Sequence, residues 1–273
     1  MQKNRIPCIK TGEFAKLCGT NKRTLIHYDE IGLFSPAYTN ELGYRYYSED
    51  QCDVFNTIVC LKDIGMPLKE IKGYIEGRNP QDLKKLLREQ HEKIKAEIAH
   101  LNRIDQVIET KIHLVDISDS ITANTVILEY CPEEYLILSP PVNSDSHDII
   151  IPILYEHIAF CNKHQLNTGH PYGAMIDKCS LKTGAFDTYA YFFTKVSNPP
   201  VSCAYYTKPA GNYVTTYLKG NYYEAESAYQ NLLHYMETAH LEIADYSYKE
   251  AILDEVAVKD SAEFLTKISI LVQ

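Results

Sequence analysis

Residues 11–47 read TGEFAKLCGTNKRTLIHYDEIGLFSPAYTNELGYRYY, and this stretch decides the fold of the N-terminal part. Apolar side chains recur at helical spacing from Phe14 to Cys18, and Thr11 is placed to cap that first helix. Gly19 supplies the left-handed conformation that a tight corner between two helices requires. The pattern therefore predicts a short helix followed at once by a second one.

The second helix is predicted to start at its cap, Thr20, and to run to about Glu30, where Gly32 stops it. Its first turn contains Lys22 and Arg23. In a helix-turn-helix, that turn enters the major groove of DNA, and the helix N-terminus favours phosphate. Two helices alone would also fit a surface helix pair with a solvated Lys-Arg dipeptide.

The cluster Gly43-Tyr44-Arg45-Tyr46-Tyr47 favours the DNA-binding alternative. It places one arginine among three aromatic rings, at a distance from the second helix that suits a wing gripping the DNA backbone. Helix, turn, helix and wing then follow one another in the order of a winged helix-turn-helix.

Here the chain resembles the N-terminal domain of the MerR family of transcription regulators. The resemblance covers roughly the first 75 residues and departs at Ile26, where the family usually has an arginine. The matching stretches are Gly12-Glu13-Phe14-Ala15-Lys16, Arg23-Thr24-Leu25, Tyr28-Asp29-Glu30-Ile31-Gly32-Leu33, Tyr44-Arg45-Tyr46-Tyr47 and Ile64-Gly65-Met66-Pro67-Leu68-Lys69-Glu70-Ile71. The residues expected to contact double-stranded promoter DNA are Thr20, Lys22, Arg23, Thr24, His27, Tyr28, Tyr44 and Arg45.

A heptad repeat follows the N-terminal part and predicts a long helix over residues 80–118. One apolar row consists of Leu87, Ile94, Leu101, Ile108 and Val115, and a second of Leu83, Ile98, Ile104 and Ile112. A repeat sustained this long favours a coiled coil over a helix packed on its own domain. The family resemblance implies an antiparallel pair that makes a homodimer, and a two-fold dimer reads a palindromic operator.

Charge is distributed unevenly along the 273 residues, whose net charge is −9. Residues 1–80 carry +1, residues 81–117 carry 0, and residues 118–273 carry −10 without a single arginine. The C-terminal part would therefore attract cations rather than DNA.

Strand-like runs begin near Asn124 and alternate with two helical runs, residues 149–164 and 222–240. The strands are expected at 126–130, 135–138, 189–196, 213–218, 249–253 and 264–272. This order predicts an α+β domain of two repeated strand-helix-strand halves, and Lys219-Gly220-Asn221-Tyr222-Tyr223-Glu224 and Tyr172-Gly173-Ala174 make it resemble a GyrI-like small-molecule-binding domain. The predicted domains are a winged helix-turn-helix over 1–79, a dimerisation helix over 80–118 and a GyrI-like effector-binding domain over 119–273.

Tyrosine dominates the chemistry of that third domain, because the chain has 22 tyrosines and no tryptophan. Tyrosine rings offer negative faces to a cation, and a buried carboxylate would complete such a site. Glu250 is the best candidate, since strand alternation turns it to the face of Tyr248; Glu129, Asp177 and Asp254 are weaker ones, and an ordinary solvent-facing strand carboxylate is the alternative. The predicted effector-binding residues are Glu250, Tyr172, Tyr189, Tyr191 and Tyr222.

Enzyme and metal-site motifs are missing from the sequence. It contains no Gly-rich phosphate loop, nucleophile elbow or H-E-x-x-H. Metal-sensing members of the MerR family place cysteines near the end of the dimer helix, whereas this chain has none between Cys60 and Cys131. We expect no catalytic residues, no metal and no cofactor.

The expected function is therefore that of a cytoplasmic, ligand-responsive activator, since no signal peptide or membrane-spanning run is found. It would sense a lipophilic or cationic drug-like molecule and remodel promoter DNA for RNA polymerase by bending and undertwisting an overlong spacer. The alternative is a GyrI-like domain that hydrolyses a small molecule or serves a non-cationic ligand.

Overall fold

The computed structural model describes residues 8–221 and 224–273. The chain forms two compact units that divide within one long helix, between Ala99 and His100, and each is described by itself. The three-part division expected at residues 79 and 118 stays a prediction.

The N-terminal unit is a small helical domain with a three-stranded sheet in the order β1-β3-β2. Its elements are β1 (Cys8–Lys10), α1 (Thr11–Leu17), α2 (Lys22–Glu30), β2 (Tyr38–Thr39), β3 (Arg45–Ser48), α3 (Gln51–Asp63), α4 (Leu68–Glu76) and the start of α5 (Pro80–Ser118). Its core is aromatic: Phe14 stacks on Tyr47 at 4.7 Å between ring centroids, and Phe34 stacks on Tyr47 at 5.6 Å. Because Tyr47 lies on β3, this stacking fixes the wing to the helices, and the predicted winged helix-turn-helix is confirmed.

The caps of the first two helices differ from those predicted. Thr11 lies inside α1, where its hydroxyl donates a hydrogen bond to the Arg45 carbonyl at 3.0 Å. Asn21, not Thr20, caps α2, because its side chain accepts a bond of 2.9 Å from the Thr24 amide. Asn and Thr both provide a side-chain oxygen that can accept this bond, so the residue types alone do not show which of the two neighbours is the cap.

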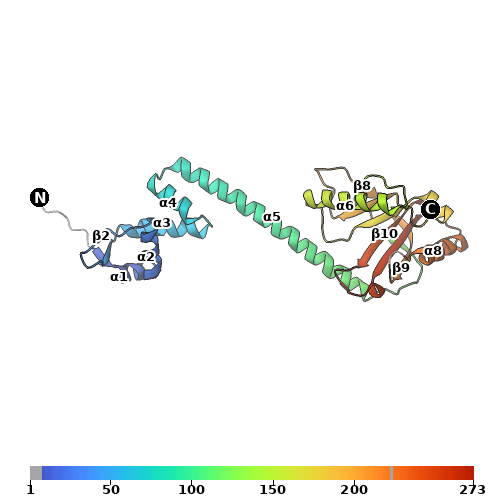
Figure 1. Cartoon of the computed structure of the whole chain (residues 1–273), viewed down its shortest axis with the longest axis horizontal. Helices are drawn as coiled ribbons and strands as arrows, with labels where there is room; N and C mark the ends of the chain where they lie inside the picture. The colour runs from blue at the N-terminus through green and yellow to red at the C-terminus, as the bar shows by residue number, and fades with distance from the viewer. Residues whose placement is uncertain (1–7, 222–223) are drawn as a thin grey trace. The chain divides into compact units, whose positions relative to one another are not determined.

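Helix α5 is unbroken over 39 residues, about 58 Å at roughly 1.5 Å per residue (Figure 1). Its apolar rows lie open in the single chain: Leu87, Ile94, Ile98, Leu101, Ile104, Ile108, Ile112 and Val115 are all exposed. Nothing within residues 8–221 and 224–273 covers this stripe, as expected for a helix that pairs with a second copy.

The C-terminal unit is built on an eight-stranded sheet in the order β4-β9-β11-β10-β6-β7-β5-β8. The strands are β4 (Ile127–Cys131), β5 (Glu134–Leu138), β6 (Gly173–Ile176), β7 (Tyr191–Val196), β8 (Tyr206–Lys208), β9 (Gly211–Lys219), β10 (Ile243–Leu253) and β11 (Leu265–Val272). The helices are α6 (His147–Lys163), α7 (Lys178–Thr183) and α8 (Glu226–Thr238), followed by a 3₁₀ turn, η1 (Ser261–Glu263). The runs β5-α6-β6-α7-β7 and β9-α8-β10-η1-β11 repeat one pattern, so the predicted α+β fold of two halves is confirmed (Figure 1).

The two faces of this sheet differ in what covers them. On one face, Leu154 of α6 and Leu232 of α8 belong to the same core as Val214 and Ile268 of the strands. The other face forms a second core around Phe193, Tyr213 and Tyr248. Only two residues separate β8, at one edge, from β9 near the opposite edge, so the sheet has to curl around this second core.

Candidate functional site

The start of α2 presents a polar, exposed surface. Lys22, Arg23 and His27 are exposed, and Thr20 and Thr24 are half-buried. The Asn21 cap leaves the remaining amides of the first turn available to an anion such as a DNA phosphate. Ile26, which stands where the MerR family usually has an arginine, is half-buried on the same helix.

The wing is tied to α2 by one ion pair. Nε of Arg45 donates to a carboxylate oxygen of Asp29 at 2.7 Å, and this hydrogen bond raises the pKa of the Arg45 guanidinium further above its ordinary value. At the tip of the wing, the Asn40 side chain accepts a bond of 2.8 Å from the Tyr44 amide and leaves the Tyr44 ring exposed. The ion pair therefore joins the wing to α2 through Arg45, and the contact of Arg45 with DNA stays a prediction.

Tyr28 does not share that surface. It is 4 % exposed and packs against Phe55, with 6.1 Å between the ring centroids. The prediction that Tyr28 contacts DNA is therefore corrected: Tyr28 is a core residue. Its side chain faces the domain interior because it follows the apolar Leu25 by three residues on the helix.

The C-terminal unit contains a cavity of about 530 Å³ on the helix-covered face of its sheet. Its apolar wall includes Ile150 and Leu154 of α6, Ala174 of β6, Phe192 of β7, and Ala251 and Leu253 of β10. Two of the predicted effector-binding residues, Tyr172 and Tyr189, also line the cavity. A volume of this size suits a drug-sized molecule.

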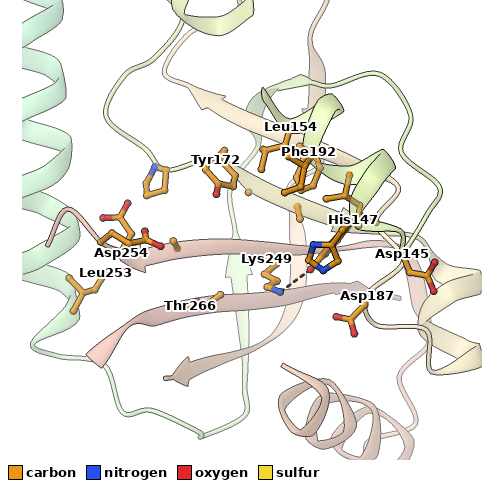
Figure 2. Close-up of a pocket in the computed structure, with 18 residues that line it drawn as sticks. Asp145, His147, Leu154, Tyr172, Asp187, Phe192, Lys249, Leu253, Asp254 and Thr266 are labelled. Atoms are coloured by element: carbon orange, nitrogen blue, oxygen red, sulfur yellow. Dashed lines mark hydrogen bonds between the residues drawn. The ribbon is translucent and has the colours of Figure 1, made fainter. Parts of the chain in front are cut away.

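Lys249 of β10 lines this cavity (Figure 2). Its side chain is only 7 % exposed, and its Nζ donates to the Tyr189 hydroxyl at 3.4 Å. The same nitrogen lies 5.5 Å from the centre of the Tyr189 ring. Burial lowers the pKa of Lys249 to about 8, against a smaller opposing effect of Asp187.

Four carboxylates line the rim of the cavity. Asp145, Asp187 and Glu255 are exposed, whereas Asp254 is half-buried and forms an ion pair of 3.4 Å with Lys111 of α5. In Figure 2, Asp254 lies at one end of the cavity and Asp145 and Asp187 lie at the other. The cavity thus has a cation at its base and anions at its rim.

Glu250 does not line this cavity, because alternation along β10 turns it to the opposite face of the sheet. There Lys208, 1 % exposed, forms ion pairs of 3.2 Å with Glu250 and 2.8 Å with Glu134. The Lys208 ammonium also lies 4.8 Å from the Tyr248 ring centre and 5.2 Å from that of Tyr213.

The charge of Glu250 is therefore already balanced within the chain. Although burial opposes its ionisation, Lys208 holds the pKa of Glu250 well below its ordinary value. The predicted face of Glu250 is the one observed, beside Tyr248. The prediction that it awaits a ligand cation is corrected, because Lys208 occupies that place.

The other predicted effector residues divide between the two faces. Tyr191 lies on the Glu250 face, with its ring 6.3 Å from that of Tyr246, so it is apart from Tyr172 and Tyr189. Tyr222 lies outside the described residues. Of the weaker carboxylates, Asp177 caps α7 and Glu129 pairs with Lys267 at 2.8 Å.

Sequence reasoning missed Lys249, His147 and Asp187 as cavity residues. For Lys249 a signal existed, since it stands next to Glu250 and must face the opposite side of the strand. His147 and Asp187 lie at a helix start and in a loop, where no periodicity indicates direction. Within residues 8–221 and 224–273, no group of three or more His, Cys, Asp or Glu side chains could hold a metal ion, and no helix is long and apolar enough to span a membrane.

Comparisons with known proteins agree with this architecture. Residues 9–78 match the model of the MerR HTH family regulatory proteins, and residues 55–110 match a second model described as MerR, DNA binding. The multidrug-efflux transporter 2 regulator of Bacillus subtilis (strain 168) is 33% identical over 263 residues, which are 96% of this chain and 96% of that protein. The chain belongs to the MerR family.

Two further likenesses of this MerR-family chain are narrower or weaker. The multidrug-efflux transporter 1 regulator of Bacillus subtilis (strain 168) is 35% identical over 98 residues, 36% of this chain and 35% of that protein. A cryo-EM structure of an EcmrR–DNA complex is 22% identical, covers 97% of this chain and 99% of that chain, and has a TM-score of 0.40. Membership rests on the relative that aligns along 96% of both chains.

The predicted function class is confirmed by this membership: the chain is a DNA-binding transcription regulator of the MerR type. Regulators of this family are dimers, and the open stripe of α5 is the apolar surface that this chain offers for pairing.

Proposed function

We propose that this regulator activates transcription from a promoter to which its dimer is bound, when a drug-like small molecule occupies the cavity around Lys249. The observation that carries the proposal is a cavity of about 530 Å³ in a chain that aligns along 96% of its length with a multidrug-efflux regulator. A multidrug transporter is the corresponding kind of target gene.

One residue that lines the cavity, and one loop residue close to it in sequence, contact helix α5. Asp254 pairs with Lys111, as described above, and Gly169, three residues before the cavity-lining Tyr172, packs on the backbone of α5. A Cβ added to Gly169 would lie 2.8 Å from the Val107 carbonyl oxygen and 3.0 Å from Thr110 Cβ. A ligand that shifts either residue would therefore shift the helix that carries the dimer seam.

The rim favours ligands with an apolar body and a positive group. Asp145 and Asp187 offer exposed negative charge, and Tyr172 and Phe192 offer aromatic surface. The counter-charge that the sequence assigned to Glu250 would then come from these rim carboxylates. We propose that the ligand is bound without turnover, in keeping with a regulatory family.

Activation would follow from indirect readout of the promoter. A dimer that prefers bent, undertwisted DNA in its ligand-bound state lowers the cost of aligning the two polymerase boxes. The ligand contributes only through its different affinity for the two states of the protein.

In vitro transcription tests the proposal. The operator would be selected from a random DNA library by the purified dimer and placed in a promoter spacer, and rhodamine 6G and tetraphenylphosphonium would be added with RNA polymerase. We expect more transcript with at least one probe, and recovery of that probe unchanged. Ala251→Trp, which fills the cavity, should abolish the response, while the matched Val256→Trp, at an exposed site outside it, should not. An equal response in both variants would contradict the cavity as the sensing site.

A further inference from the structure

Two lysines of the C-terminal unit are almost fully buried, and they differ in their partners. Lys208 is held by two carboxylates at 2.8 and 3.2 Å. Lys249 has no carboxylate within 4.0 Å of its Nζ in the described part of the chain, and its one hydrogen bond, to the Tyr189 hydroxyl, is long at 3.4 Å. Buried ammonium groups are normally paired, because an isolated buried charge is costly.

None of the carboxylates that line the cavity forms an ion pair with Lys249. Asp187 acts on the Lys249 ammonium electrostatically, but it is exposed and outside ion-pair distance. Asp254 is already engaged by Lys111, and Asp145 and Glu255 are exposed at the rim. An acceptor that pairs with Lys249 therefore has to enter through the cavity into which its Nζ points (Figure 2).

We propose that Lys249 receives an acidic group of the ligand, so that the cavity selects amphiphiles with a carboxylate or sulfonate at its base. A basic group on the same molecule would then lie among the rim carboxylates, which makes a zwitterion the best match. This inference deepens the proposed function and rests on it, because it specifies the chemistry of the same cavity.

The arrangement also disfavours a ligand whose positive group is inserted first. Such a ligand would bring its charge toward the Lys249 ammonium in a poorly solvated site, where like charges repel strongly. An inserted anion gains a charge-assisted hydrogen bond from Lys249 and relieves the desolvation of the lysine. The carboxylates at the rim and the Lys249 ammonium at the base thus fix the orientation of a zwitterion: its acidic group enters first.

The test is fluorescence titration of the full-length protein with four dansyl probes that share one body. Dansylglycine carries an anion, dansylcadaverine a cation, Nα-dansyl-lysine both charges separated by its side chain, and dansylamide neither. Nα-dansyl-lysine should bind most tightly and dansylglycine more tightly than dansylcadaverine. In Lys249→Met, Nα-dansyl-lysine and dansylglycine should lose roughly tenfold or more in affinity, dansylamide should change little, and dansylcadaverine should gain.

Two further variants separate recognition from folding. Lys249→Arg keeps the charge and should keep the preference for acidic probes. Lys259→Met removes an exposed lysine outside the cavity and should change nothing. If Lys249→Met does not fold, loss of the acidic preference in Lys249→Gln decides the matter in the same way.

The outcomes distinguish this inference from the function on which it rests. Equal losses for all four probes in Lys249→Met, or none, would overturn the role of Lys249 and leave the cavity as a sensing site. If none of the four probes binds the unaltered protein while rhodamine 6G still raises transcript, the acidic-group chemistry is wrong and the sensor proposal stands. If none of the four dansyl probes binds and neither rhodamine 6G nor tetraphenylphosphonium raises transcript, the inference about Lys249 and the proposed function are both wrong.

Discussion

Arg23 and Arg45 are both predicted to contact DNA, but the structure gives them different surroundings. Arg23 is exposed in the first turn of α2, whereas Arg45 is paired with Asp29 and joins the wing to that helix. Loss of Arg23 should therefore affect DNA alone, and loss of Arg45 should affect both DNA and the domain.

We expect Arg23→Ala to weaken operator binding and to reduce the salt slope by about one phosphate contact, with no change in melting temperature. Arg45→Ala should weaken binding as well, and should also cost the domain up to about 1 kcal/mol, since the pair with Asp29 is partly exposed. Electrophoretic shifts at three salt concentrations and thermal melts measure the two effects. Unchanged DNA binding in Arg23→Ala would contradict the docking of α2.

His157 predicts a specific loss of stability in mild acid. It is buried, with its Nε2 2.9 Å from the Thr194 hydroxyl, and burial lowers its pKa from 6.5 to about 4. The folded protein therefore prefers the neutral ring, so this stability is fully present above pH 6.5 and is lost as the pH falls from 6.5 toward 4.

Urea unfolding at pH 7 and pH 5 checks this, with an expected loss of at most roughly 1.4 kcal/mol per pH unit from this histidine. His170, whose pKa burial also lowers to about 4, adds in the same direction. His157→Gln should flatten the dependence, and His234→Gln, at an exposed position on α8, should not. An equal dependence in both variants would show that other groups cause the loss.

The limits of sequence reasoning are clearest at Lys249 and Glu250. Period-two alternation correctly placed Glu250 beside Tyr248, because strand geometry is local. It could not show that Lys208, 42 residues away, would reach Glu250, nor that the opposite face would be hollow beside Lys249. Both facts depend on which strands and helices meet across the sheet.

At the scale of elements, long periodic segments were predictable and short buried ones were not. The heptads of α5 and the strand β11 appear where their patterns indicate. Strand β6 reads Gly-Ala-Met-Ile and is buried on both faces, so it shows no alternation, and β8 has three residues only. Such segments become strands because neighbours pair with them.

The exposed stripe of α5 leads to a prediction about assembly. Ile94→Glu with Leu101→Glu places two carboxylates in the seam of the helix pair, where burial without partners is costly. Sedimentation should show a monomer, and operator binding should be lost. The control pair Lys93→Glu and His100→Glu, on exposed positions beside the seam, should remain dimeric. A dimer in the seam variant would mean that α5 pairs through another face.

At the scale of the whole molecule, the chain around the cavity is joined to the dimer helix by two contacts, Asp254 with Lys111 and Gly169 with the backbone of α5. Gly169 adopts φ +97°, which only glycine adopts freely, and it lies against α5 with no room for a side chain. We expect Gly169→Ala to push the loop off the helix. Transcript levels should then no longer respond to ligand, while titrations with Nα-dansyl-lysine should show binding within about twofold of the unaltered protein. A normal response in this variant would show that Asp254 and Lys111 transmit the signal alone.

The close approach of Gly169 also has a genetic consequence. A selection for colonies that resist a drug without prior exposure would demand regulators locked in the active state. Such alleles should gather at the contact itself, at Gly169 and at Val107 and Thr110 on the facing helix, rather than among the residues that hold the ligand. Resistance by this route would need one nucleotide change and would leave the ligand site intact. The regulator of such a strain would therefore still bind the drug, although it no longer needs the drug to activate transcription.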